Sequence, residues 1–489
     1  WLTHLFNGMP PPTTSPRRLA QLSNNAKALP YAHTTSSAIA FMLSRLEIPP
    51  TTFSSAEKLS VLLQHAVCKY TSCRQDDIYL VQWVVEQDGS NVKLHGVMPH
   101  WHCGSLNRTT IPKPDEHFVQ ERQAAQLIAD AIARSNPNRT ISFLLDLTDR
   151  CTIDLFIDSC RYPLLCHVRR KGSCALPIPY RDWWTHRYGS QVSYLTGHQS
   201  KAKRSDMSVS HTLHWRGQPR YTCRVPPWDV LCQRTRLAWV THLLCAAEQR
   251  EVEVRRSNGH HSHHHHSSSS STCTFDAKLV MGALHHSKEA AAFFQRHERE
   301  MITTKEADAK ANGLSSKKAA SSEVGIDTWL SHQFVAEVEG YGYSGAVMWK
   351  LLTNRTLVLP DSSENFTTWH TLLLVPSVHY IRLPRNFSAA NVAMAVRATS
   401  PNEAKAIAAN AYSLGKLVSD ANPSFGEAYL SSLLDTLVER MAFKRRRFQS
   451  NGRGLPPACF AADTGDWGVK CEAEGCEANA PWSQARIFM

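Results

Sequence analysis

The sequence predicts an α/β fold, and two observations carry this prediction. Apolar, β-branched runs alternate along the chain with segments of helical periodicity, which is typical of sheets covered by helices. In addition, residues 334–361 combine a strand, a glycine loop, a helix and a second strand in one stretch. At 489 residues, the chain is long enough for two or three domains with their own cores.

The first part of the chain predicts a linker followed by a domain. Residues 1–55 are rich in Pro, Thr and Ser, so we expect a stem or linker there, with one helix over 36–46. An N-terminal α/β domain is expected over 56–195. Its predicted elements are helices over 56–67 and 116–134 and strands over 78–85, 141–147 and 153–157.

A second α/β domain is expected over 196–400, with a helix over 233–247. Its segment 257–272 contains a histidine tract followed by a serine run, for which a disordered insert is the favoured interpretation and metal binding the alternative. Residues 288–322 are rich in Ala, Lys and Glu, which predicts a helix and a loose loop.

The end of the chain predicts helices and then an irregular tail. Helices are expected over 401–420 and 425–448, so that 401–448 forms a C-terminal helical segment. Residues 449–489 are expected to be irregular and held by disulfides.

The stretch 334–361 is the most informative part of the sequence. Phe334 to Val338 reads as a strand, and Ala346 to Leu352 as a helix that leads to a strand at Leu357 to Leu359. Glycines between the first strand and the helix permit a tight turn. This layout places the start of a helix against an anionic group.

The loop in this stretch has three interpretations. Gly340, Gly342 and Gly345 form a G-x-G-x-x-G pattern, and Asp361 follows about twenty residues on, as in NAD-binding domains. A glycine turn without a ligand is the second interpretation. The third depends on a resemblance given below.

Composition and charge indicate a globular protein with an anionic ligand. The chain is 42% hydrophobic and 20% charged, with a net charge of +12. Its pI near 9.1 fits a nucleotide sugar or a nucleic acid. The basic residues are dispersed without a zinc-finger, RNA-recognition or basic-zipper pattern, so we expect no nucleic-acid partner.

Two features predict the lumen of the secretory pathway, in the endoplasmic reticulum or the Golgi. The sequence contains fourteen cysteines, for which disulfides are the expected use and no zinc-type spacing is found. It also contains five N-glycosylation acceptors, at Asn107, Asn138, Asn354, Asn365 and Asn386.

Membrane attachment depends on what precedes the chain. No run of eighteen apolar residues occurs in the sequence. Because the chain begins at Trp1, a signal peptide or an N-terminal membrane anchor absent from this chain is one interpretation.

Several segments together resemble glycosyltransferase family 90, the protein O-glucosyltransferase and fungal capsule xylosyltransferase family. Thr356–Leu359 is similar to that family's "SLVL" strand, Ser377–Leu383 to its "W-V-H-Y-V-P-V" segment, and Asn386–Ala389 to its "D-L-S-N" helix start. Leu176–Trp184 resembles the "I-P-x-P-x-x-x-F-W" segment, and His211–Arg220 the strand that ends in "F/W-R-G". The order and spacing of these segments agree with the family.

The resemblance implies a GT-B-like protein with two Rossmann-like domains facing across a cleft. It implies inverting transfer from UDP-glucose or UDP-xylose to a hydroxyl of a protein or glycan, without a metal or other cofactor. The residues implied to bind the donor are Arg216, Gly217, Arg220, Arg234, Gly340, Gly342, Ser344, Gly345, Lys350 and Glu364. Arginine pairs bidentately with phosphate, which suits Arg216 to this role.

The chain departs from the family pattern at two positions. Ala346 follows Ser344-Gly345 where the family often has a phosphate-binding arginine, and Lys350 is one turn later. The aspartate that acts as the catalytic base in the family is also unmatched, because the corresponding turn begins Cys160-Arg161. Asp158 and Asp182 are the candidate bases. The alternatives are a catalytically silent relative that binds a nucleotide or glycan, and an NAD-dependent oxidoreductase.

Overall fold

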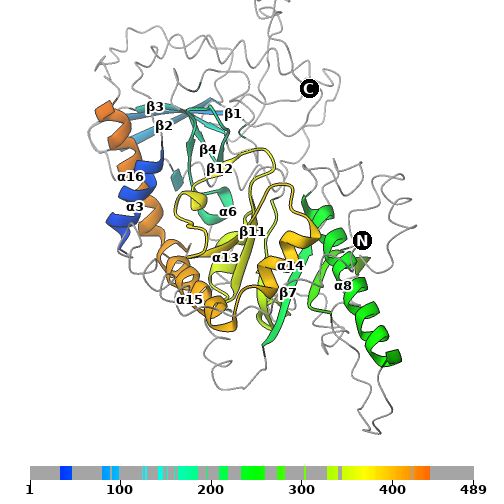
Figure 1. The fold of residues 1–489 in the computed structure, drawn as a ribbon. Helices are drawn as coiled ribbons and strands as arrows, with labels where there is room; N and C mark the ends of the chain where they lie inside the picture. The colour runs from blue at the N-terminus through cyan, green and yellow to red at the C-terminus, as the bar shows by residue number, and fades with distance from the viewer. Residues whose placement is uncertain are drawn as a thin grey trace, which may run out of the picture. The chain divides into compact units, whose positions relative to one another are not determined.

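The structure, a computed structural model, divides into two compact units, each of which contains a sheet (Figure 1). The first unit comprises Trp1–Arg45 and His186–Gly426, and the second comprises Leu46–Thr185 and Glu427–Met489. Helices and parallel strands occur together, so the predicted α/β class is confirmed. Apart from a few single positions, the described residues are 34–46, 80–88, 91–97, 141–146, 164–184, 209–217, 233–258, 273–280, 302–303, 328–339, 344–419 and 422–440.

The sheet of the first unit has six strands, and every pair of neighbours is parallel. In chain order they are β7 (Ser210–Gly217), β8 (Phe275–Val280), β9 (Ile302–Thr303), β10 (His332–Ala336), β11 (Thr356–Pro360) and β13 (Tyr380–Leu383). The spatial order is β13-β11-β10-β7-β8-β9. Numbered along the chain, this is the 3-2-1-4-5-6 order of doubly wound folds.

The strand order creates a switch point between β7 and β10. The chain moves outward from β7 through β8 to β9, and then returns to the other side of β7 as β10. The connections of these two neighbouring strands therefore leave in opposite directions. Doubly wound sheets bind ligands at the carboxyl ends of such a strand pair.

Helices from two of the connections and helices that follow β13 cover the sheet. α8 (Gln233–Asn258) contacts α14 (Ala389–Arg397), and α13 (Ala346–Leu351) contacts α15 (Pro401–Val418) (Figure 1). Right-handed crossovers that leave in opposite directions place their helices on opposite faces. Strands covered on both faces are apolar throughout, as the fully buried Phe334, Val335, Leu357 and Val358 show.

Side-chain caps define where α14 and α15 begin. The Ser388 hydroxyl accepts from Asn391 N, while the Asn391 side chain accepts from Ser388 N, which forms a reciprocal capping box. The Ser400 hydroxyl accepts from Glu403 N, and Pro401 occupies the first turn of α15, where no N–H is required.

Three short elements complete the described part of the first unit. α3 (Thr35–Arg45) contacts the 3-10 helix η3 (His370–Leu372), and Arg45 Nη1 donates to Leu372 O at 2.7 Å. The third, β12, spans Thr367–Thr368.

The second unit has a mixed sheet in the order β2-β1-β3-β4-β6. β1 (Leu80–Asp88) pairs antiparallel with β2 (Asn91–Val97) and β3 (Ile141–Asp146), whereas β3, β4 (Leu164–Cys166) and β6 (Leu176–Pro177) are parallel. β5 (Val168–Arg169) and α6 (Arg181–Trp184) also belong to this unit. From α16 (Pro423–Arg440), the Tyr429 hydroxyl donates to Pro177 O at 2.8 Å.

Most predicted elements within the described residues are confirmed. The helix predicted over 233–247 is present and extends further, to Asn258. Within 288–322, where a helix and a loose loop are predicted, the structure describes the short edge strand β9, and the rest of that segment lies outside the described residues. The hairpin strand β2 was not predicted, although Asp-Gly at 88–89 is a turn signal. The helix predicted over 56–67, the strand over 153–157 and the tail 449–489 lie outside the described residues.

Disulfides are present in both units, as the cysteine content predicted. Cys151 pairs with Cys166, and Cys245 pairs with Cys273, with Cα–Cα distances of 5.5 and 5.4 Å. The second disulfide joins α8 to the segment that enters β8, across the sequence that contains the histidine tract. Cys174 is also disulfide-bonded.

Within the described residues, none of the helices has the length and apolar character needed to cross a bilayer.

The contact between α13 and α15 requires a glycine, and this can be tested. A Cβ at Gly415 would lie 2.9 Å from Leu351 Cβ and 3.1 Å from the Leu351 carbonyl carbon, so Gly415→Ala would push two backbones apart. We expect the free energy of unfolding to fall by about 1–3 kcal/mol, although Gly-to-Ala within a helix is usually stabilising by roughly 0.5–1 kcal/mol. Urea unfolding measures the difference, with Ser413→Ala on the exposed face as the control. A stability gain in Gly415→Ala would contradict this contact.

Candidate functional site

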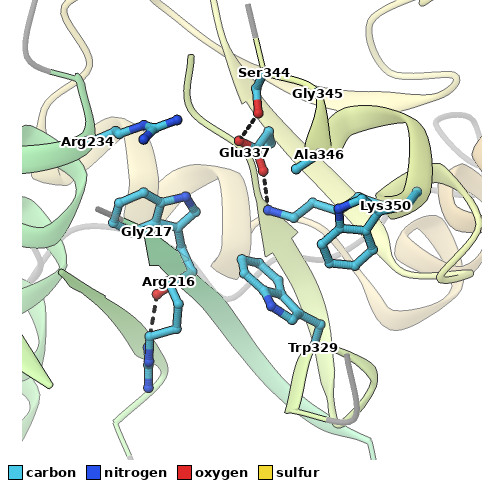
Figure 2. A pocket seen from close by; sticks show the side chains of 11 residues that line it. Arg216, Gly217, Arg234, Trp329, Glu337, Ser344, Gly345, Ala346 and Lys350 are labelled. Carbon is cyan, nitrogen blue, oxygen red and sulfur yellow. Dashed lines mark hydrogen bonds and ion pairs between the residues drawn. The ribbon is translucent and has the colours of Figure 1, made fainter. Parts of the chain in front are cut away.

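A pocket of about 350 Å³ lies at the carboxyl ends of β7 and β10, at the switch point of the first unit (Figure 2). Its walls come from the end of β7, the start of α8, the residues just before and just after β10, and α13. The lining residues are Trp215, Arg216, Gly217, Arg234, Trp329, Glu337, Ser344, Gly345, Ala346, Trp349 and Lys350. The pocket is therefore lined by cations, a carboxylate and three indole rings.

Arg234 enters the pocket because the start of α8 is attached to the sheet. Gln233 Nε2 donates to the carbonyl oxygens of Asp361 and Arg385, at 2.7 and 3.3 Å, beyond the ends of β11 and β13. This attachment fixes the first turn of α8 across the carboxyl edge of the sheet. In Figure 2 the Arg234 guanidinium is directed toward Glu337 and Ser344.

A buried ion pair forms the back of the pocket. The ammonium group of Lys350 donates to the carboxylate of Glu337 and, at 2.9 Å, to Ala336 O. The other carboxylate oxygen of Glu337 accepts from the Ser344 hydroxyl (Figure 2). Glu337 and Lys350 are 5% and 1% exposed, so their two charges neutralise one another almost without solvent.

Trp329 holds the same ammonium group from a third side. Lys350 Nζ lies 3.6 Å from the centroid of the Trp329 ring, which is cation–π geometry. Burial lowers the pKa of Lys350, while the charge of Glu337 opposes this shift. The three donors of Lys350 thus face groups of the protein, so Lys350 holds the wall of the pocket together.

Arg216 lines the pocket, but its guanidinium is bound to Asp276 on β8. Arg216 Nη2 donates to Asp276 Oδ2 at 2.7 Å, and Nη1 donates to Asp276 O at 2.8 Å and to Trp215 O at 2.9 Å. In Figure 2 this side chain points away from Glu337 and Lys350. Arg216 therefore ties β7 to β8 in this structure, whereas we had expected it to face the ligand.

Asp276 also binds His214, which is fully buried on β7. The two side chains lie 3.2 Å apart, between His214 Nδ1 and Asp276 Oδ2. Burial alone would raise the pKa of Asp276, but the hydrogen bond from His214 and the charge of Arg216 outweigh it and hold this pKa well below the usual range. Burial and the charge of Arg216 lower the pKa of His214, so its imidazole is neutral.

His214, Asp276 and His332 bring potential metal-ligand atoms within 4.8 Å of one another. However, the two imidazole rings are stacked, with centroids 4.4 Å apart and planes 8° apart, so their lone pairs do not converge on one point. Asp276 Oδ2 also accepts from the Arg216 cation. This arrangement is that of a hydrogen-bonded cluster between strands rather than a metal centre.

The side chain of Trp215 leaves no room for a Cβ atom at Gly217. A Cβ at this position would lie 2.4 Å from the Trp215 ring, which packs over the glycine. The resemblance to family 90 implies a donor-binding role for this glycine. In the structure it allows the indole of Trp215 to fold back against the wall of the pocket.

The pocket brings together six of the predicted donor-binding residues: Arg216, Gly217, Arg234, Ser344, Gly345 and Lys350. Glu364 lies outside it, beyond β11, where it raises the pKa of Glu339 in addition to the main effect of burial. Asp182 is in α6 of the second unit, and its side chain is outside the described residues. Asp158, Arg220, Gly340 and Gly342 also lie outside them.

Sequence reasoning did not identify Glu337, Trp215, Trp329, Ala346 or Trp349 as site residues. A signal existed for Glu337, because it is a charged residue within an otherwise apolar strand run. The tryptophans gave no such signal, since an indole in an α/β domain usually belongs to the core.

No known family matches this chain, and no curated protein matches it.

The lowered pKa of His214 predicts a dependence of stability on pH. The unfolded chain binds a proton at His214 below about pH 6.5, whereas the folded chain resists it. Stability should therefore be complete above about pH 6.5 and fall on acidification, by at most about 1.4 kcal/mol per pH unit for one histidine. Urea unfolding between pH 7 and pH 5 measures this slope.

The matched variant is His214→Asn, which keeps a donor toward Asp276 but does not titrate. Its slope should be smaller than that of the parent. His370, whose pKa burial lowers to about 3, contributes equally to both proteins. Equal slopes in the two proteins would show that His214 is not kept neutral by the fold.

Proposed function

We propose that the pocket binds the diphosphate of a nucleotide sugar, and that the chain is an inverting glycosyltransferase of the GT-B type. The observation that carries the proposal is the cationic pocket at the switch point of the six-stranded sheet. Arg234 and Lys350 carry two positive charges there, against one negative charge on Glu337. Arg216 also lines the pocket, where it pairs with Asp276.

Arg234 is the group that would contact the phosphates, and Ser344 would join it by turning its one hydroxyl proton from Glu337 to a phosphate oxygen. A guanidinium offers paired N–H donors that match phosphate oxygens, and Arg234 is directed across the pocket (Figure 2). The Ser344 hydroxyl lies at the start of α13 and already donates to Glu337. Lys350 would add its positive charge from behind this contact.

The nature of the donor and acceptor follows from the resemblance to family 90. UDP-glucose or UDP-xylose would be the donor, and a hydroxyl of a protein or glycan the acceptor. Asp158 or Asp182 would be the base that takes the proton of this hydroxyl. A lumenal location suits the acceptors at Asn354, Asn365 and Asn386, whose side chains are exposed in the structure.

Two observations favour this proposal over NAD binding. Asp361, the acidic residue of the dinucleotide pattern, is bound by Arg382 through two hydrogen bonds of 2.6 and 2.8 Å. The glycine pattern also follows β10, the fourth strand of the sheet in chain order, whereas dinucleotide-binding domains carry it after the first. A catalytically silent relative that binds the same nucleotide remains the second candidate.

Binding of UDP tests the proposal, and the most informative variant is Arg234→Ala. We expect wild-type protein to bind UDP and not NAD in calorimetric titrations. Arg234→Ala should weaken UDP binding by about 1.5–3 kcal/mol, the usual range for a hydrogen bond to a charged group. Arg382→Ala is the control, because it removes the same charge from an exposed ion pair outside the pocket.

Arg216→Ala distinguishes the two arginines that line the pocket. Because its guanidinium is bound to Asp276, the variant should lower stability more than UDP affinity. The placement of the phosphates would be contradicted if Arg234→Ala bound UDP as tightly as wild type does. In that outcome Arg216→Ala and Arg382→Ala would lose UDP affinity equally.

Measuring the consumption of the sugar nucleotide distinguishes an active enzyme from a catalytically silent relative. We expect transfer or hydrolysis of UDP-glucose or UDP-xylose, and a loss of roughly 10²- to 10⁴-fold when the base is removed. Asp158→Asn and Asp182→Asn are the variants to compare. Protein that binds UDP but consumes neither sugar nucleotide would favour the silent relative.

A further inference from the structure

The accessible face of α13 within the pocket is made of two small residues and one indole. Val347, Met348, Lys350 and Leu351 point into the protein and are buried. Gly345, Ala346 and Trp349 are partly exposed, and all three line the pocket. Residues three and four apart share a helix face, so the small residues leave the surface beside Trp349 uncovered.

Trp349 differs from the other two tryptophans of the pocket in its accessibility. Trp215 and Trp329 are 1% and 5% exposed, whereas Trp349 is partly exposed. Leu195, Leu330 and Leu352 form a buried cluster against which Trp349 packs. Its ring also meets Trp329 edge to face, with centroids 5.9 Å apart. The indole is thus held in place on one side and accessible from the pocket.

The position of Trp349 along α13 matches the extent of a nucleotide sugar. Ser344, at the start of the helix, is the proposed phosphate contact, and Trp349 follows five residues later. At a rise of 1.5 Å per residue, the two positions are about 7 Å apart along the helix axis. A ring attached to a phosphate bound at Ser344 would therefore reach the indole.

We infer that Trp349 is a platform on which the ring attached to the diphosphate stacks. This inference rests on the proposed function, and it names the part of the ligand that the apolar wall of the pocket recognises. A nucleobase and a pyranose both present a flat face of low polarity to an indole, and either could occupy the platform. Stacking of a base on an aromatic side chain typically contributes about a 10-fold gain in affinity.

The test compares three ligands: inorganic pyrophosphate, UDP and UDP-glucose. Trp349→Leu removes the aromatic face but keeps an apolar side chain against Leu330 and Leu352. We expect this variant to bind pyrophosphate as wild type does and to lose about 10-fold in affinity for a ligand that carries the stacked ring. A loss already seen with UDP assigns the platform to the base, and a loss seen only with UDP-glucose assigns it to the sugar.

Two further variants guard against a general disturbance of the pocket. Trp349→Phe keeps an aromatic ring and should retain most of the affinity lost in Trp349→Leu. Ala346→Leu should cover the platform and reproduce the loss while Trp349 is unchanged. The thermal midpoint of each variant reports whether it is folded.

The result that overturns the inference differs from the one that overturns the proposed function. If wild-type protein binds all three ligands and Trp349→Leu binds them equally well, Trp349 serves only in core packing and the platform is wrong. An equal loss for all three ligands, pyrophosphate included, would also overturn the platform. If wild-type protein binds none of the three, the proposed function is wrong and the platform falls with it.

Discussion

The buried ammonium group of Lys350 is the constraint on which the rest of the pocket depends. Burying an unpaired charge costs several kcal/mol, so Lys350 requires Glu337 beside it. The same carboxylate binds Ser344, and Trp329 covers the ammonium group. Glu337 follows the last residue of β10, and Ser344 precedes α13. A single carboxylate therefore ties the end of β10 to the start of α13, and residues of both segments line the pocket.

The opposite wall uses a second ion pair in the same way. Arg216 at the end of β7 binds Asp276 on β8, and His214 binds the same carboxylate. Two of the cations that line the pocket thus hold its walls together. Arg234, at the start of α8, is directed across the pocket (Figure 2). The pocket consequently combines one guanidinium directed inward with the charge of a buried ammonium group.

The sequence was sufficient to predict the α/β class, the helix α13 and six residues that line the pocket. The class and the helix depend on local patterns, namely apolar runs and helical periodicity, whereas the six residues were implied by the resemblance to family 90. The sequence was not sufficient to predict the direction of Arg216, because this depends on Asp276, sixty residues later in the chain. The roles of Trp329 and Trp349 were missed for the same reason. An indole against the core and an indole in a pocket look alike until strands distant in sequence are neighbours.

The pocket and the two candidate bases belong to different units of the chain. Every residue that lines it belongs to the first unit, whereas both candidate bases, Asp158 and Asp182, belong to the second. The ion pairs of Glu337 and Asp276, the attachment of α8 by Gln233 and the indoles are all built within the first unit. The first unit could therefore keep a nucleotide site even if the second lost the base. For this reason an active transferase and a silent relative would share the same pocket, and only chemistry outside it distinguishes them.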